Sequence, residues 1–196
     1  LSGPITSYIE SPANIPLLNI NDPSQIAVTK VVCGWDHCIV LLEDNTVYVW
    51  GNNAQGQLNY DPMAKPSIKD GFIYHPINFD YEVFDVGWGS NHSVFIAIAK
   101  DGANQSRQLL TCGYHGCLGV NNVNEDDYNL NRVIIPELLD LDRIEFLIWK
   151  FNSNAIIDID QNLYYWGDEY DGFRVRVPEK KVWFDKRIVD ITFGYR

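Results

Sequence analysis

The chain of 196 residues has no long apolar run and little positive charge. No apolar segment approaches the roughly 20 residues that a membrane-spanning helix needs, and no secretory signal segment is visible. Fifteen basic residues stand against 26 acidic ones, which gives a formal net charge of −11. Because nucleic acids and acidic membranes attract basic proteins, the sequence disfavours both as direct ligands. The acidity indicates either a well-solvated surface or a field that attracts a basic protein partner.

Cysteine is also scarce. Four cysteines are too few for a disulfide framework in a chain of this length, so we expect a reducing, intracellular compartment, cytoplasmic or nuclear. Cys33 and Cys38 have the same spacing as Cys112 and Cys117, and each pair encloses a histidine. Zinc is one interpretation, since thiolates and imidazoles are its usual ligands. We expect no metal, because the repeat described below accounts for most of these positions.

Catalytic patterns are missing as well. The sequence contains no Gly-x-Ser-x-Gly elbow, and the segment from Gly87 to His92 lacks the third glycine and the helix of a nucleotide-binding loop. The acidic turn from Asp168 to Gly172 lacks the alternating ligands of a calcium loop. We therefore expect no catalytic residue, no cofactor, and no hydrolase or transferase activity.

The chain does contain one well-defined unit, between Val31 and Leu58. Two apolar runs, Ile39 to Leu42 and Val47 to Trp50, flank the polar turn Glu43 to Thr46, which predicts a β-hairpin. A glycine precedes the first run and another follows the second, as expected for tight turns or close backbone approaches. Such a hairpin cannot bury both faces alone, so the unit should recur.

The unit does recur, from Val83 to Gly119 and from Ile144 to Phe173, and a further copy starts at Ile188. The glycine after the second strand returns at 62 and then 54 residues, at positions 51, 113 and 167. We expect antiparallel pairs between Ile39–Leu42 and Val47–Trp50, between Val94–Ile98 and Leu109–Cys112, and between Ala155–Ile159 and Leu163–Trp166.

Two finer expectations concern the strands. Alternation should place Val47 and Val49 on one face of the sheet and Tyr48 and Trp50 on the other. The segment from Ile135 to Phe146 has apolar residues near helical spacing, but we expect a loop that leads into a strand. The polar segments between the copies, Asn59 to Pro76, Asn121 to Pro136 and Asp171 to Pro178, are predicted to be surface connections.

This unit closely resembles the repeat of the regulator of chromosome condensation family. The first copy carries the motif most completely, at Cys33, Gly34, His37, Asp44, Trp50, Gly51, Gly56, Gln57 and Leu58. The second copy has Cys112 where the repeat has tryptophan. The third has Lys150 in place of the glycine and Ser153 in place of the histidine.

The resemblance implies an all-β fold, a β-propeller of which this chain holds an incomplete arc of about three to four blades. We expect one partial propeller over residues 1–196. It would comprise the tail of a preceding repeat (1–25), two repeats (26–82 and 83–143), a divergent repeat (144–187) and the start of another (188–196). An arc leaves end faces open, so we expect the same or another chain to complete the ring.

The residues that we expect to matter are structural repeat positions: Gly34, His37, Trp50, Gly51, Gly56, Gly89, His92, Gly113, Trp166, Gly167, Gly172 and Gly194. A histidine that recurs once per repeat is expected to be a structural hydrogen-bonding group rather than a base.

Three functions remain open. We favour a regulatory scaffold that binds a protein partner through its rim loops. The resemblance also implies a guanine-nucleotide exchange factor for a Ran-like small GTPase, or a substrate-recruiting part of a ubiquitin ligase. Because fold does not transfer function, we expect no acceleration of nucleotide release from this chain alone, although the full-length protein could have that activity.

Overall fold

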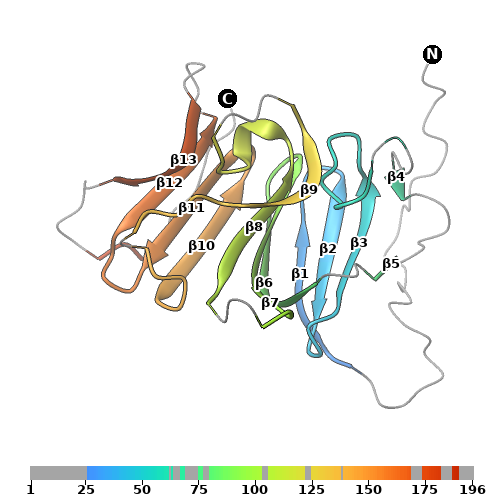
Figure 1. Cartoon of the computed structure of the whole chain (residues 1–196), viewed down its shortest axis with the longest axis horizontal. Helices are drawn as coiled ribbons and strands as arrows, with labels where there is room; N and C mark the ends of the chain where they lie inside the picture. The colour runs from blue at the N-terminus through green and yellow to red at the C-terminus, as the bar shows by residue number, and fades with distance from the viewer. Residues whose placement is uncertain are drawn as a thin grey trace.

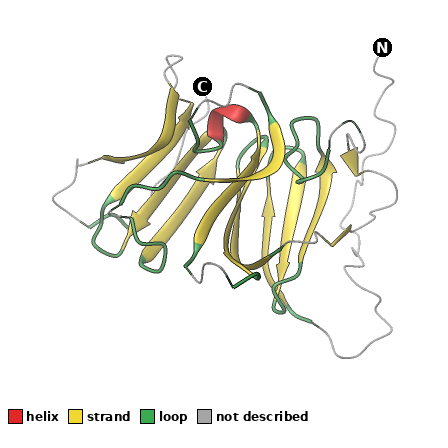
Figure 2. Ribbon diagram, viewed as in Figure 1, coloured by secondary structure: helices red, strands yellow, loops and turns green. Residues whose placement is uncertain are grey.

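The structure is a computed structural model that describes residues 26–61, 63, 67–68, 75–76, 80–102, 106–121, 125–137, 139–168, 174–181 and 187–189. In these ranges, antiparallel strands form three sheets that stand side by side along the molecule (Figure 1). Helix is confined there to one short 3-10 turn (Figure 2). The predicted all-β class is therefore confirmed.

Each sheet is built from consecutive strands. The first contains β1 (Val28–Cys33), β2 (His37–Leu42), β3 (Val47–Asn52), β4 (Ser67–Ile68) and β5 (His75–Pro76). The second contains β6 (Tyr81–Trp88), β7 (His92–Ala99), β8 (Gln108–Gly113) and β9 (Asp127–Arg132). The third contains β10 (Ile144–Lys150), β11 (Ser153–Asp158), β12 (Leu163–Asp168) and β13 (Arg174–Lys181). The 3-10 helix η2 (His115–Cys117) follows β8.

The three predicted hairpins are confirmed as the antiparallel pairs β2–β3, β7–β8 and β11–β12. Strand alternation also holds in β3, where Val47 and Val49 join one buried cluster and Tyr48 joins another. Trp50, the fourth residue of the strand, packs against both clusters. The predicted loop before β10 is confirmed too, because the strand begins only at Ile144.

The predicted connections between the copies need a correction, because each of them contains strand. The short strands β4 and β5 lie in the first connection, β9 lies in the second, and β13 overlaps the third. Among the described strands, these lie at the outer edge of their sheets, where polar residues suit the exposed position. An edge also tolerates the proline that β13 contains at Pro178.

Apolar side chains fill the space between neighbouring sheets. β1, β6 and β10 are the inner strands through which the three sheets contact one another. Phe95 of β7 packs toward the first sheet, whereas Val94 and Ile96 pack with residues of the third. Because successive residues of a strand point to opposite faces, β7 is buried on both sides, which explains its nearly continuous apolar sequence.

All three inner strands run toward the same end of the molecule. There they turn at residues 34–36, 89–91 and 151–152 into the strands that follow, and η2 lies at the same end. We call this end the turn face. It holds the histidine and glycine positions that recur in the repeat.

Candidate interaction site on the turn face

The two repeat histidines join one sheet to the next. His37 opens β2 and His92 opens β7, and their side chains are 1% and 0% exposed. His92 Nε2 lies 2.6 Å from Asn154 Oδ1 of the third sheet, and His37 Nε2 lies 3.2 Å from Ser93 Oγ of the second. Ser93 and Asn154 occupy the same place, the second residue of β7 and of β11. The same histidine contact therefore occurs at both junctions between neighbouring sheets.

The hydrogen-bond partners fix the tautomer of both rings. The oxygen Asn154 Oδ1 can only accept, so His92 Nε2 must donate. Ser93 Oγ donates its one proton to the carbonyl oxygen of Gln57 at 2.7 Å, so it accepts from His37 Nε2. Neither Nδ1 atom has a hydrogen-bond partner among the residues that the structure describes.

This environment keeps both imidazoles neutral. Burial lowers the pKa of His37 and of His92 to about 4, because a charged ring would be desolvated there. A proton on Nδ1 would also lack an acceptor among the described groups. Each ring is consequently a fixed donor at neutral pH, and neither is placed to act as a general base.

A glycine beneath each ring makes this packing possible. A Cβ on Gly34 would lie 2.2 Å from His37 Cε1 and 2.6 Å from the carbonyl oxygen of Gly89. A Cβ on Gly89 would lie 1.9 Å from His92 Cε1 and 2.3 Å from the carbonyl oxygen of Phe151. The glycine is therefore required by the ring above it and by the backbone of the next sheet.

The third copy lacks both the repeat glycine and the repeat histidine. Because the two residues depend on each other, one cause explains both departures from the repeat. Lys150 stands in place of the glycine, and Ser153 stands in place of the histidine. Without an imidazole ring, the glycine is no longer required beneath it. Ser153 Oγ lies 3.1 Å from Tyr165 Oη and 3.2 Å from the carbonyl oxygen of Asp168, so it bonds within its own sheet.

In the second and third sheets, the residue at the tryptophan position of the repeat contacts the same kind of acceptor, a backbone carbonyl oxygen from the preceding repeat. Trp166 Nε1 donates to the carbonyl oxygen of Cys117 at 3.1 Å, and Asn154 Nδ2 donates to the same oxygen at 3.2 Å. In the second sheet, Cys112 takes the tryptophan position and its Sγ lies 3.6 Å from the carbonyl oxygen of Gln57. The sulfur thus replaces the indole N–H at the equivalent oxygen.

The remaining predicted positions lie mainly where strands end. Gly51, Gly113 and Gly167 have φ angles of 109°, 111° and 125°, which favour glycine. Gly56 has a φ of 83° in the turn after β3, and Trp50 is half-buried in that strand. The structure does not describe Gly172 and Gly194.

The cysteines do not gather into one cluster. All four are free thiols, with Cys33 and Cys38 on the first sheet and Cys112 and Cys117 buried at the second. Among the described residues, no group of three or more His, Cys, Asp or Glu side chains is arranged to hold a metal ion. Within the same ranges, no helix is long and apolar enough to cross a membrane.

A cavity of about 200 Å³ opens between the turns of the turn face. Its lining residues come from all three turns: Gly34, Trp35, Trp88, Gly89, Ser90 and Phe151. Backbone bonds hold these turns in a row, because Trp35 N donates to Ser90 O at 3.3 Å and Ser90 N donates to Phe151 O at 2.7 Å. Trp35 is 70% exposed at the edge of this cavity.

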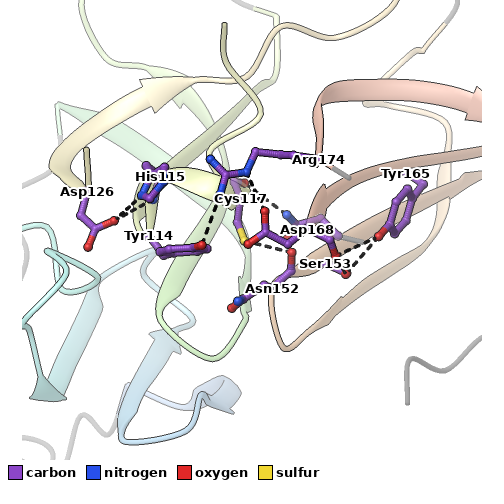
Figure 3. Close-up of polar contacts among 10 residues, drawn as sticks. Tyr114, His115, Cys117, Asp126, Asn152, Ser153, Tyr165, Asp168 and Arg174 are labelled. Carbon is purple, nitrogen blue, oxygen red and sulfur yellow. Dashed lines mark hydrogen bonds and ion pairs between the residues drawn. The ribbon is translucent and has the colours of Figure 1, made fainter. Parts of the chain in front are cut away.

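Polar side chains form a second feature of the turn face, which we call the rim cluster: Tyr114, His115, Asp126, Asp168 and Arg174 (Figure 3). Arg174 Nε lies 2.7 Å from Asp168 Oδ1, and Arg174 Nη2 lies 3.4 Å from Tyr114 Oη. His115 Nδ1 lies 2.8 Å from Asp126 Oδ1. Burial is the main cause that raises the pKa of Tyr114 to about 12. The cluster ties η2 to the third sheet.

A larger cavity, of about 500 Å³, lies beside the inner strands away from the turns. Its charged lining residues are already paired with other side chains. Lys30 Nζ lies 2.6 Å from Asp85 Oδ1, Arg107 Nε lies 3.0 Å from Asp142 Oδ1, and the Arg107 guanidinium lies 5.1 Å from the centre of the Phe84 ring. Glu145, the remaining charged lining residue, pairs with Arg187 at 2.5 Å, so each charged side chain of this cavity has a partner.

Comparison with known proteins identifies the repeat. Residues 28–57 match the model of the regulator of chromosome condensation (RCC1) repeat. An RCC1-like G exchanging factor-like protein from Mus musculus is 27% identical over 108 residues, which cover 55% of this chain and 22% of that protein. An RCC1 repeat-containing protein from Schizosaccharomyces pombe is 28% identical over 151 residues, which cover 74% of this chain and 37% of that protein. Residues 28–57 of this chain are an RCC1 repeat, and the chain is similar to RCC1-like proteins over a longer stretch.

Solved structures show the same architecture. Human WBSCR16 superposes with a TM-score of 0.65 at 21% identity, over 84% of this chain and 42% of that one. Prp20p from Saccharomyces cerevisiae superposes with a TM-score of 0.62 at 22% identity, over 82% of this chain and 40% of that one. The three sheets are therefore blades of an RCC1-type β-propeller, and the chain spans about two fifths of these solved chains.

The RCC1 motif drew attention to buried residues rather than to exposed ones. Sequence reasoning singled out His37 and His92 but missed Trp35, the most prominent side chain of the turn face. A signal was available, because Trp35 and Trp88 adjoin the repeat glycines and Phe151 follows Lys150 at the equivalent place. An aromatic residue that recurs beside the turns indicates aromatic side chains at the end of the blades, and of these three Trp35 is the exposed one.

Proposed function

We propose that this RCC1-type arc is a regulatory protein-binding module whose turn face holds a basic partner. The observation that carries the proposal is Trp35, 70% exposed beside a cavity that joins the turns of three blades. Exposed aromatic residues next to a pocket are frequent anchors of protein interfaces. The four free thiols support the intracellular compartment that the composition predicts.

Charge supports a basic partner. The chain has a net charge of −11, and exposed carboxylates lie on the turn face at Asp36, Glu125 and Asp126. Asp36 follows Trp35 in the sequence, and its carboxylate accepts from Asn52 Nδ2 at 2.6 Å, which holds it against the end of β3. An acidic field of this kind speeds the encounter with a basic surface and disfavours acidic competitors.

Nucleotide exchange on a small GTPase is the second candidate. It is supported by the name of the mouse relative, a G exchanging factor-like protein, and by the structure of Prp20p, which was reported with its binding to Gsp1p and histones. Exchange needs a group that displaces the phosphate or magnesium contacts of the nucleotide. We expect this chain to bind such a partner without accelerating release, because a shared fold does not transfer the activity. Recruitment to a ubiquitin ligase stays a sequence prediction.

The test measures binding of two probes, Gsp1p and core histones, by calorimetry. Trp35→Ala should weaken binding of the true partner at least tenfold, because truncation of an aromatic anchor typically costs about 2 kcal/mol or more. Ile159→Ala is the matched control, since Ile159 is 52% exposed but lies in the turn after β11, at the opposite end of the blade. Equal affinities for both variants would contradict the turn face as the site.

Mixtures of the protein with Gsp1p also distinguish a binding module from an exchange factor. A fluorescent guanine nucleotide loaded on Gsp1p reports its release. Binding without faster release supports the module, whereas an increased release rate that Trp35→Ala abolishes would favour exchange. Thermal melts of each variant show that the blades remain folded.

A further inference from the structure

Cys33 and Cys38 face each other on the neighbouring strands β1 and β2 of the first blade. They are direct partners in the antiparallel register of β1 and β2. Gly34 N donates to His37 O at 2.7 Å, so the neighbouring Cys33–Cys38 pair lies between hydrogen bonds rather than on them. In such pairs the Cα atoms are about 4.5 Å apart and the side chains are at their closest. Disulfides span Cα distances of roughly 4.4 to 6.8 Å, so this geometry permits one.

Exposure and protonation separate this pair from the other two cysteines. Cys33 is exposed and Cys38 is half-buried, whereas Cys112 and Cys117 are buried. A hydrogen bond from the Cys38 thiol lowers the pKa of Cys33 to about 7, and the same contact raises the pKa of Cys38. Burial raises the pKa of Cys112 to about 12 and that of Cys117 well above its usual value. Near neutral pH, only Cys33 has a substantial thiolate fraction.

We propose that Cys33 and Cys38 form a redox-active dithiol that low-molecular-weight disulfides, such as glutathione disulfide, convert to an intramolecular disulfide. The Cys33 thiolate attacks one sulfur of glutathione disulfide and releases one glutathione thiolate. The Cys38 thiol then loses its proton and its sulfur attacks Cys33 Sγ, which releases the second glutathione. The two protein thiols are oxidised, and one glutathione disulfide is reduced to two glutathione molecules.

The position of Cys38 in the repeat gives this reaction a structural consequence. Ser93 and Asn154 are its counterparts in the next two blades, and each accepts a hydrogen bond from the histidine of the preceding blade. Cys38 lies on the face of the first sheet that points away from the second sheet, because its neighbour Ile39 belongs to the cluster between the two. Oxidation therefore removes the Cys38 thiol proton at the position where Ser93 and Asn154 form a hydrogen bond to the preceding blade.

The experiment equilibrates the protein with glutathione redox buffers, blocks free thiols with an alkylating reagent and maps the peptides by mass spectrometry. We expect a Cys33–Cys38 linkage with the loss of two hydrogens. Cys112 and Cys117 should be alkylated only after unfolding, and their protection reports that the blades are folded. In Cys38→Ala, Cys33 should instead retain glutathione as a mixed disulfide, because the resolving thiol is absent.

A pH profile separates a tuned thiol from a merely exposed one. Alkylation of Cys33 should show a midpoint near pH 7 in the unsubstituted protein. In Cys38→Ala the midpoint should move toward the ordinary value of about 8.5, since the hydrogen bond is lost. The proposal is overturned if Cys33 keeps glutathione in the unsubstituted protein, if all four thiols react alike, or if Cys38→Ala leaves the midpoint unchanged.

Discussion

The two repeat histidines give this propeller a pH-dependent bond between its blades. His37 and His92 are neutral donors to Ser93 and Asn154, with pKa values of about 4 against an ordinary value of 6.5. Since protonation favours the unfolded chain, their contribution is fully present above pH 6.5. It is lost as the pH falls from there toward about 4.

We therefore predict that the free energy of unfolding falls across this pH window by about 1.4 kcal/mol per pH unit for each histidine. Urea denaturation at a series of pH values measures the slope. His92→Gln lowers stability at every pH, but it should also remove the slope due to that ring. An unchanged slope in His92→Gln would mean that the buried imidazole does not titrate as its surroundings indicate.

The glycine beneath the ring is the second prediction at this scale. Gly89→Ala should destabilise the chain by about 3 kcal/mol, because the added Cβ meets both the His92 ring and the carbonyl oxygen of Phe151. Thr29→Ala, on an exposed position of β1, is the control and should change stability by less than about 0.5 kcal/mol. Denaturation midpoints at pH 7 provide the measurement, and a cost below 1 kcal/mol for Gly89→Ala would contradict the described packing.

Sequence reasoning reached the histidines but not their partners. Recurrence once per repeat indicated a structural role for His37 and His92. Their acceptors lie 56 and 62 residues further along the chain and differ in residue type, serine and asparagine. A contact of this kind depends on how two blades meet, which local patterns do not determine.

At the scale of elements, the hairpins were predictable and the outer strands were not. β2 and β3 are bounded by turn residues and have clear apolar runs, so both the strands and their pairing followed from pattern. β9 has the sequence DYNLNR and, among the described strands, pairs with β8 alone. Its strand conformation is imposed by that neighbour rather than by its own composition.

The junction between the second and third blades gives a prediction at this scale. The Trp149 and Trp166 rings meet edge to face with centroids 5.7 Å apart, and both side chains are buried. Trp166→Cys copies the residue that the second blade has at this position. It should nevertheless cost about 3 to 5 kcal/mol, because the small side chain leaves a cavity against Trp149 and replaces the indole donor to the carbonyl oxygen of Cys117 with a weaker thiol donor.

Chemical denaturation of Trp166→Cys gives this cost directly. Trp166→Phe is the matched control, because it keeps an aromatic ring beside Trp149 but cannot donate to the carbonyl oxygen of Cys117. It should lose less than Trp166→Cys. If the cysteine variant were as stable as the unsubstituted chain, the tryptophan would not be a principal contact between these blades.

At the scale of the whole molecule, the three blades present their inner turns on one face. Trp35, Ser90 and Phe151 come from separate repeats, and the backbone bonds between the turns align them. The sequence predicted the repeats and the acidity, but it could not predict that three turns would enclose one cavity. That arrangement depends on the rotation between blades, which packing of their buried faces determines.

Hydrogen exchange of the chain with and without its partner tests the central claim, binding at the turn face, most directly. With Gsp1p or core histones as the probe, the account predicts added protection at residues 34–36, 89–91 and 151–152. The hairpin turns at the opposite end, residues 43–46 and 159–162, should exchange at the same rate in both samples. Protection confined to those opposite turns, with the turn face unchanged, would contradict the account.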